Sequence, residues 1–102
     1  MKQFVYAVFD RASGIYDRPF VGQGDGAVMR SFGDIAVSAD HPIGQHPEDY
    51  TLFRIGTYDD NSGELLGCPA EKVVGAIEMV AESRKKVKEV PVDLVKAAGE
   101  VN

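Results

Sequence analysis

The spacing of apolar and polar residues predicts four β-strands in this chain. Residues 4–9 are apolar at every position, so both faces of an extended strand would be covered, and this strand is expected at the centre of a sheet. Residues 15–21 follow as its hairpin partner, and Pro19 lacks the N–H that a ladder needs, which predicts an edge strand or a bulge. Along residues 50–58 the side chains alternate between two faces, one of which is expected to be buried, and this predicts a third strand. Residues 64–67 predict a short fourth strand.

Two further stretches repeat apolar residues at intervals of three and four, the spacing of an amphipathic helix. The first is expected to have Asp25 as its N-cap and to be short, because Gly33 weakens a helix by up to ~1 kcal/mol relative to alanine. The second, residues 70–86, is expected to be the longest helix and to start behind Pro69, a residue favoured in a first helical turn. Residues 38–47 lack either spacing and predict a loop. The apolar stripes comprise Val28, Met29, Phe32, Ile35 and Ala36 in the first helix and Val73, Ala76, Ile77, Val80 and Ala81 in the second.

The phrase aromatic-Asp-x-x-Ser-Gly occurs at residues 9–14 and again at residues 58–63. In such a phrase the Asp and Ser side chains bond the local backbone, and the glycine accepts a positive φ. The repetition predicts two strand-turn-strand-helix units, residues 4–36 and residues 53–85, which share one sheet because a single unit cannot bury its own apolar face. We therefore expect an α+β fold: a four-stranded, mainly antiparallel sheet with two helices on one face.

The length and composition set the scale of the molecule. A chain of 102 residues that is 44% hydrophobic and 26% charged accommodates one domain with a modest core. We expect this α+β domain over residues 1–86 and a partly flexible C-terminal tail over residues 87–102. Apolar residues on both strand faces and both helices exceed what one small core covers, which predicts a homodimer.

Cysteine content and hydropathy indicate the compartment. The single Cys68 excludes an internal disulfide framework and is what a reducing compartment allows. The first residues contain no apolar stretch of signal-peptide length, and no run approaches the ~20 residues of a membrane span. We expect an intracellular, soluble protein that does not enter a membrane.

Charge is distributed unevenly along the chain, whose formal net charge is −5. Residues 1–83 carry 6 Lys or Arg against 13 Asp or Glu, a balance of −7, whereas residues 84–102 carry 5 against 3, a balance of +2. An acidic body repels polyanions at long range. The basic cluster comprises Arg84, Lys85, Lys86 and Lys88. It either complements the dipole at a helix C-terminus or contacts phosphate or an acidic partner.

The histidines, the glycine-rich segment and the cysteine of this chain could in principle bind a metal, bind a phosphate or act in catalysis, but a structural role explains each of them. His41 and His46 lie near several acids, but their spacing matches no zinc pattern. The glycines at 22, 24 and 26 match neither dinucleotide-binding nor P-loop spacing, and Asp25 stands where a phosphate would bind. Cys68 has no evident base or acid partner. We expect no enzyme, no cofactor and no metal site.

The aromatic side chains fall on or beside the predicted strands. A sheet that exposes rings can stack unpaired bases, although core packing accounts for most rings in most sheets. The candidate nucleic-acid contacts are Tyr6 as a stacking ring, Arg54 as a flanking cation, and the basic cluster of Arg84, Lys85, Lys86 and Lys88.

An ordered set of short motifs resembles a known family. They are Val-Tyr-Ala-Val-Phe-Asp at residues 5–10, Arg-Pro-Phe-Val at 18–21, His-Pro-Glu-Asp-Tyr at 46–50, Leu-Phe-Arg-Ile-Gly-Thr-Tyr-Asp at 52–59, and the turn at Gly63. Together they resemble the small nonstructural protein of gokushovirus-type microviruses, which are phages with circular single-stranded DNA genomes. The resemblance covers roughly residues 4–80 and excludes the basic cluster.

The resemblance implies a protein absent from the mature capsid and active in single-stranded DNA synthesis in the host bacterial cytoplasm. It supplies no catalytic residues. Two hypotheses follow: an interaction protein that binds the phage replication initiator or host replication proteins and couples synthesis to packaging, or a single-stranded DNA-binding module. A small host-targeting effector is a third alternative.

Overall fold

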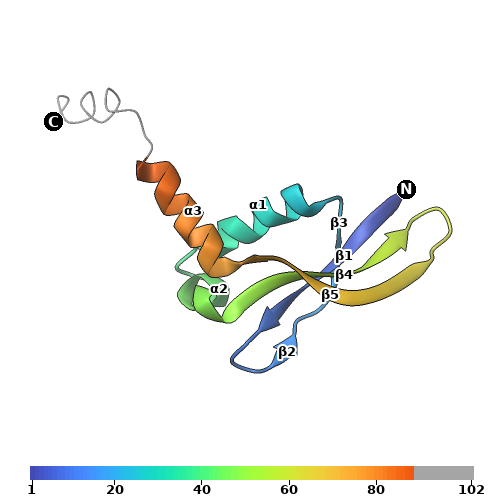
Figure 1. The fold of residues 1–102 in the computed structure, drawn as a ribbon, viewed down its shortest axis with the longest axis horizontal. Coiled ribbons are helices and arrows are strands. Elements are labelled where there is room, and N and C mark those ends of the chain that lie inside the picture. Colours follow the sequence, from blue (N-terminus) through green and yellow to red (C-terminus); the bar gives the residue numbers. More distant parts are fainter. Residues whose placement is uncertain (89–102) are drawn as a thin grey trace.

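Two long antiparallel strands, β1 (Lys2–Asp10) and β4 (Tyr50–Asp59), pair along their lengths at the centre of a sheet in the computed structural model, which describes residues 1–88 (Figure 1). β5 (Leu65–Gly75) pairs with the other edge of β4. The short strands β2 (Ile15–Tyr16) and β3 (Phe20–Gly22) pair with the other edge of β1. Every pairing is antiparallel, so the predicted α+β fold with an antiparallel sheet is confirmed.

The central position predicted for the first strand is confirmed, and so is the effect of Pro19. The predicted second strand is interrupted between Tyr16 and Phe20, which yields two short edge strands in place of one. Pro19 lies in the interruption, where its missing N–H removes no ladder hydrogen bond.

The principal helices α1 (Asp25–Ala36) and α3 (Ala76–Lys88) lie on the same face of the sheet and contact each other (Figure 1). Asp25 is the first residue of α1 and not the predicted N-cap, which is Gly24, because the Asp25 carboxylate accepts hydrogen bonds from Tyr6 and Arg54. The predicted loop at residues 38–47 instead contains the short helix α2 (Pro42–Gln45) and leads into the 3₁₀ turn η1 (Pro47–Asp49). His41 caps α2, because its Nδ1 accepts a hydrogen bond from the Ile43 N–H at 3.1 Å. Two prolines, each at the start of a short helix, provide the local signal.

The predicted helix over residues 70–86 begins too early. Residues up to Gly75 belong to β5, and the helix starts at Ala76. Cross-strand pairing outweighs the helical spacing, because Val74 pairs with the fully buried Leu52 of β4. Pro69 lies within β5 at a bulge. Glu71 pairs with Arg54 and Gly67 pairs with Gly56, so the β5 residues between them, which include Pro69, have no ladder partner.

The core lies between the sheet and the two helices. Tyr6 and Leu52 are its largest fully buried side chains. The stripe predicted for the first helix is confirmed in that Val28, Phe32 and Ala36 are buried and Met29 and Ile35 pack beside them. The stripe predicted for the second helix is partly wrong: Ile77 and Ala81 are exposed, while Ala76, Met79 and Val80 face the core.

The two copies of the repeated phrase form the same turn at equivalent strand ends. β1 ends at Asp10 and β4 ends at Asp59, and each is followed by a glycine at positive φ, 75° at Gly14 and 76° at Gly63. Each glycine N–H donates to the aspartate carbonyl four residues earlier, at 2.8 and 2.7 Å. Each aspartate carboxylate also accepts the N–H two residues on, at 3.0 and 2.9 Å. The sequence repeat therefore corresponds to a structural repeat of the two hairpins.

The described part of the chain ends in α3, two residues beyond the predicted domain boundary at residue 86. The predicted flexible tail, residues 87–102, falls outside the described residues from position 89 onward. No helix in the described part of the chain is long and apolar enough to cross a membrane.

We predict that Gly63→Ala lowers the free energy of unfolding by about 1–2 kcal/mol, because a Cβ at φ 76° is strained even in open space. Gly67→Ala is the matched control: it lies on the same hairpin, has no positive φ, and leaves its Cβ without a neighbour within 4 Å. Urea unfolding followed by circular dichroism measures both. Equal stabilities of the two variants would contradict the assignment of strain to Gly63.

Candidate interaction surfaces

Tyr6, the predicted stacking ring, lies in the core. It is fully buried, its ring stacks on Phe20 at 5.8 Å between centroids, and its hydroxyl donates to Asp25 Oδ1 at 2.7 Å. Burial, followed by the hydrogen bond to Asp25, raises the pKa of Tyr6 to about 12. A ring without exposed surface cannot stack on a base, so the folded chain does not present Tyr6 to a nucleic acid.

Arg54, the predicted flanking cation, is bound within the molecule. Its guanidinium donates to Asp25 Oδ2 at 3.1 Å and to Glu71 Oε2 at 2.8 Å, and it lies 4.8 Å from the centroid of the Phe4 ring. The hydrogen bond to Glu71 and the charge of Asp25 raise the pKa of Arg54 above its ordinary value. Two carboxylates therefore neutralise the cation that was predicted to meet phosphate.

The basic cluster occupies the last turns of α3, which projects away from the sheet (Figure 1). Arg84 and Lys85 are exposed there, and Lys86 and Lys88 belong to the same helix. The structure thus brings Tyr6 and Arg54 together through Asp25 and places the basic cluster on a separate element.

The sheet face opposite α1 and α3 is largely apolar, and no described helix packs across it, although Glu78 in the first turn of α3 reaches Lys72 at its edge; we call it the open face. Strand register places fourteen residues on it: Gln3, Val5, Ala7, Phe9, Tyr16, Val21, Thr51, Phe53, Gly56, Tyr58, Leu65, Gly67, Lys72 and Gly75. Three rings cluster at one end: Phe9 and Tyr16 lie 4.8 Å apart between centroids, and Phe53 lies 5.6 Å from Tyr16. The sequence signal was the apolar character of every position in residues 4–9.

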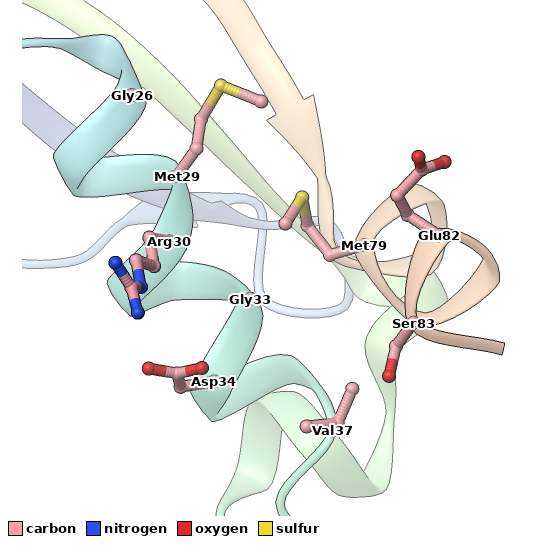
Figure 2. A pocket seen from close by; sticks show the side chains of 9 residues that line it. All are labelled: Gly26, Met29, Arg30, Gly33, Asp34, Val37, Met79, Glu82 and Ser83. Atoms are coloured by element: carbon pink, nitrogen blue, oxygen red, sulfur yellow. The ribbon is translucent and has the colours of Figure 1, made fainter. Parts of the chain in front are cut away.

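A groove of about 630 Å³ separates α1 from α3 (Figure 2). Gly33 permits the close approach of the helices, since a Cβ there would lie 2.6 Å from Met79 Cε. Figure 2 shows Met79 extending toward α1, with Arg30 and Asp34 on the α1 side and Glu82 on the α3 side. The remaining lining residues are Gly26, Met29, Val37 and Ser83. The groove therefore combines flexible apolar side chains with a rim of both charge signs.

A smaller cleft of about 380 Å³ lies between the first hairpin and α2. Its polar side chains are those of Asp10, Ser13, Asp17, His41 and Tyr50. Burial, with smaller contributions from Asp10 and neighbouring acids, raises the pKa of Tyr50 above its ordinary value. Among residues 1–88, no three His, Cys, Asp or Glu side chains converge as metal ligands.

This α+β chain, with its paired hairpins and two helices on one sheet face, belongs to the phage ORF5 protein family. The family model matches residues 3–80, which span the sheet apart from Lys2, together with α1, α2 and the start of α3. The basic cluster lies beyond the matched region. No curated protein and no solved structure matches the chain.

We predict that Arg54→Met lowers the free energy of unfolding, since it removes charge-assisted hydrogen bonds to Asp25 and Glu71. Arg18→Met is the control, because the Arg18 side chain is exposed and makes no hydrogen bond or salt bridge within the described chain. Urea denaturation of both variants provides the comparison. An unchanged midpoint for Arg54→Met would show that the ion pairs do not stabilise the fold.

Alkaline pH provides a second test of the same network. The pKa of Tyr6 is higher in the folded chain than its ordinary value of 10.0, so its contribution to stability is complete below pH 10 and is lost as pH rises toward about 12. We predict a steeper loss of stability over this range for the natural chain than for Tyr6→Phe, with Tyr58→Phe as the control. Thermal unfolding at successive pH values measures the slopes, and equal slopes for Tyr6→Phe and the natural chain would contradict this assignment.

Proposed function

We propose that this phage ORF5 protein is a nonstructural accessory protein of a gokushovirus-type microvirus that supports synthesis or packaging of the single-stranded genome by binding a protein partner. The expected partner is the phage replication initiator or a host replication protein, in the bacterial cytoplasm. The phage family supports the setting, and the sequence motifs that resemble the gokushovirus protein support the specific role.

One contrast is the main support for the proposal. Two of the side chains predicted to contact DNA are bonded within the chain, whereas large apolar side chains are exposed on its surface. Tyr6 and Arg54 are engaged with Asp25, and residues 1–83 keep their formal balance of −7. Exposed apolar side chains favour contact with a protein, whereas an acidic surface opposes contact with phosphate. The large exposed apolar residues include Ile15, Tyr16, Phe20, Val21, Val37, Leu65, Leu66 and Ile77.

The groove between α1 and α3 is the contact that we propose for this partner. An amphipathic helix binds such a groove through an apolar face, and methionine side chains adapt to the shape of the bound residues. Met29 and Met79 supply that adaptable surface. Arg30 on one side and Glu82 on the other allow charged residues of the partner helix to fix its direction.

The aromatic cluster of the open face supports a second candidate function, binding of single-stranded DNA. Exposed rings stack on bases with about 1–3 kcal/mol per base. Phe9, Tyr16 and Phe53 would supply the rings, and Arg84, Lys85, Lys86 and Lys88 the cations. This candidate requires binding that weakens steeply with salt, because phosphate contacts release counterions.

We predict that Val37→Glu abolishes capture of the partner and that Ile77→Glu does not. The two residues are matched in exposure, 52% and 51%, but only Val37 lines the groove. Tagged full-length protein is recovered from infected cells with and without nuclease, and captured proteins are identified by mass spectrometry. We expect nuclease-resistant capture of a replication protein, and fewer single-stranded genomes relative to duplex DNA in cells that carry Val37→Glu.

Two results would oppose this function. Equal capture and equal single-strand yield with Val37→Glu would remove the groove as the contact. Tight binding of an oligothymidylate in fluorescence anisotropy at low salt, lost on truncation after Ser83 and in moderate salt, would favour the DNA-binding alternative instead.

A further inference from the structure

The composition of the open face is that of an interior sheet surface. Among its fourteen residues only Lys72 is charged, and Lys72 is paired with Glu78 at the start of α3. Val5 and Ala7 at its centre are buried, whereas Tyr16, Val21 and Leu65 nearer its edges are exposed. By contrast, the opposite face carries the charges of Arg54 and Glu71, and Arg54 pairs with both Glu71 and Asp25 of α1.

The dimensions of the open face suit association of two sheets. β1 has nine residues, so at a rise of about 3.3 Å per residue the face is about 30 Å long. Four strand positions at a spacing of about 4.8 Å make it about 19 Å wide. Two such faces would bury about 1,200 Å² in total, which is at the lower limit of specific, stable interfaces.

The face is also self-complementary in charge, because two copies bring no unpaired charge into contact. We propose that a second copy of this chain covers the open face, so that the functional unit is a dimer of two sheets packed face to face at the ~10 Å separation of a β-sandwich. Tyr16, Phe9 and Phe53 of each copy would lie at the interface, and both α1–α3 grooves would remain on the outside.

The dimer has a salt dependence opposite to that of DNA binding. Each chain carries a formal charge of −5, so two copies repel each other at low ionic strength. Salt screens this repulsion, since the Debye length falls from about 30 Å at 0.01 M to about 8 Å at 0.15 M. Self-association through the open face therefore strengthens as salt increases.

Neighbouring residues provide variants that differ only in the face they occupy. Tyr16→Lys with Leu65→Lys places charge on the open face, at positions 45% and 67% exposed. Ile15→Lys with Leu66→Lys places the same charge on the opposite face, at positions 64% and 52% exposed. Both double variants change net charge equally and leave the core untouched.

Sedimentation equilibrium of the full chain at 20 mM and 300 mM NaCl tests the proposal. We expect twice the 11.0 kDa chain mass at 300 mM, weaker association at 20 mM, and an increase of about 30-fold or more in the dissociation constant for the open-face variant. The control variant should remain dimeric. If circular dichroism shows that the double variant is unfolded, Leu65→Lys alone is compared with Leu66→Lys.

Three outcomes would overturn the proposal: a monomer at both salt concentrations and 100 µM protein, a dimer that the open-face variant leaves intact, or a dimer that the control variant disrupts equally. A monomer whose Tyr16 and Phe53 resonances shift on addition of an oligothymidylate would assign the open face to single-stranded DNA.

Discussion

The carboxylate of Asp25 connects α1 to the two central strands of the sheet. It accepts the Tyr6 hydroxyl of β1 and the Arg54 guanidinium of β4, and Arg54 extends the network to Glu71 of β5. Asp25 lies in the first turn of α1, where a negative charge also suits the helix dipole. Because these groups bond one another, the polar side chains on the helix-covered side of the sheet are paired within the chain.

This arrangement accounts for the difference between the two sheet faces. α1 and α3 supply one apolar layer, and that layer covers the face that carries Tyr6, Leu52 and Val74. No described element remains to cover Tyr16, Val21 and Leu65 on the other face. A chain of this size builds one core between two layers, which leaves the second sheet face without a covering layer in the described part of the chain.

The sequence predicted those structural features that depend on residues close together in the chain. The uniform apolar character of residues 4–9, the proline at 19 and the two turn phrases gave the central strand, the broken edge strand and the matching hairpins. The start of the last helix depends on a partner distant in sequence: Val74 pairs with Leu52, and nothing in residues 70–75 records that pairing. The roles of Tyr6 and Arg54 depend in the same way on Asp25, which is 19 and 29 residues away in the chain.

The extent of the family match bears on which function the fold serves. The matched region ends at residue 80, before the basic cluster, yet it includes the strands that form the open face and the whole of α1. A function that depended on Arg84 to Lys88 would rest on a segment outside the part that defines the family. The open face and most of the groove lie inside that part, on opposite sides of the sheet, so the second copy and the partner helix that we propose would not compete for one surface. This placement supports the protein-binding function that we propose over the DNA-binding alternative, which depends on the basic cluster.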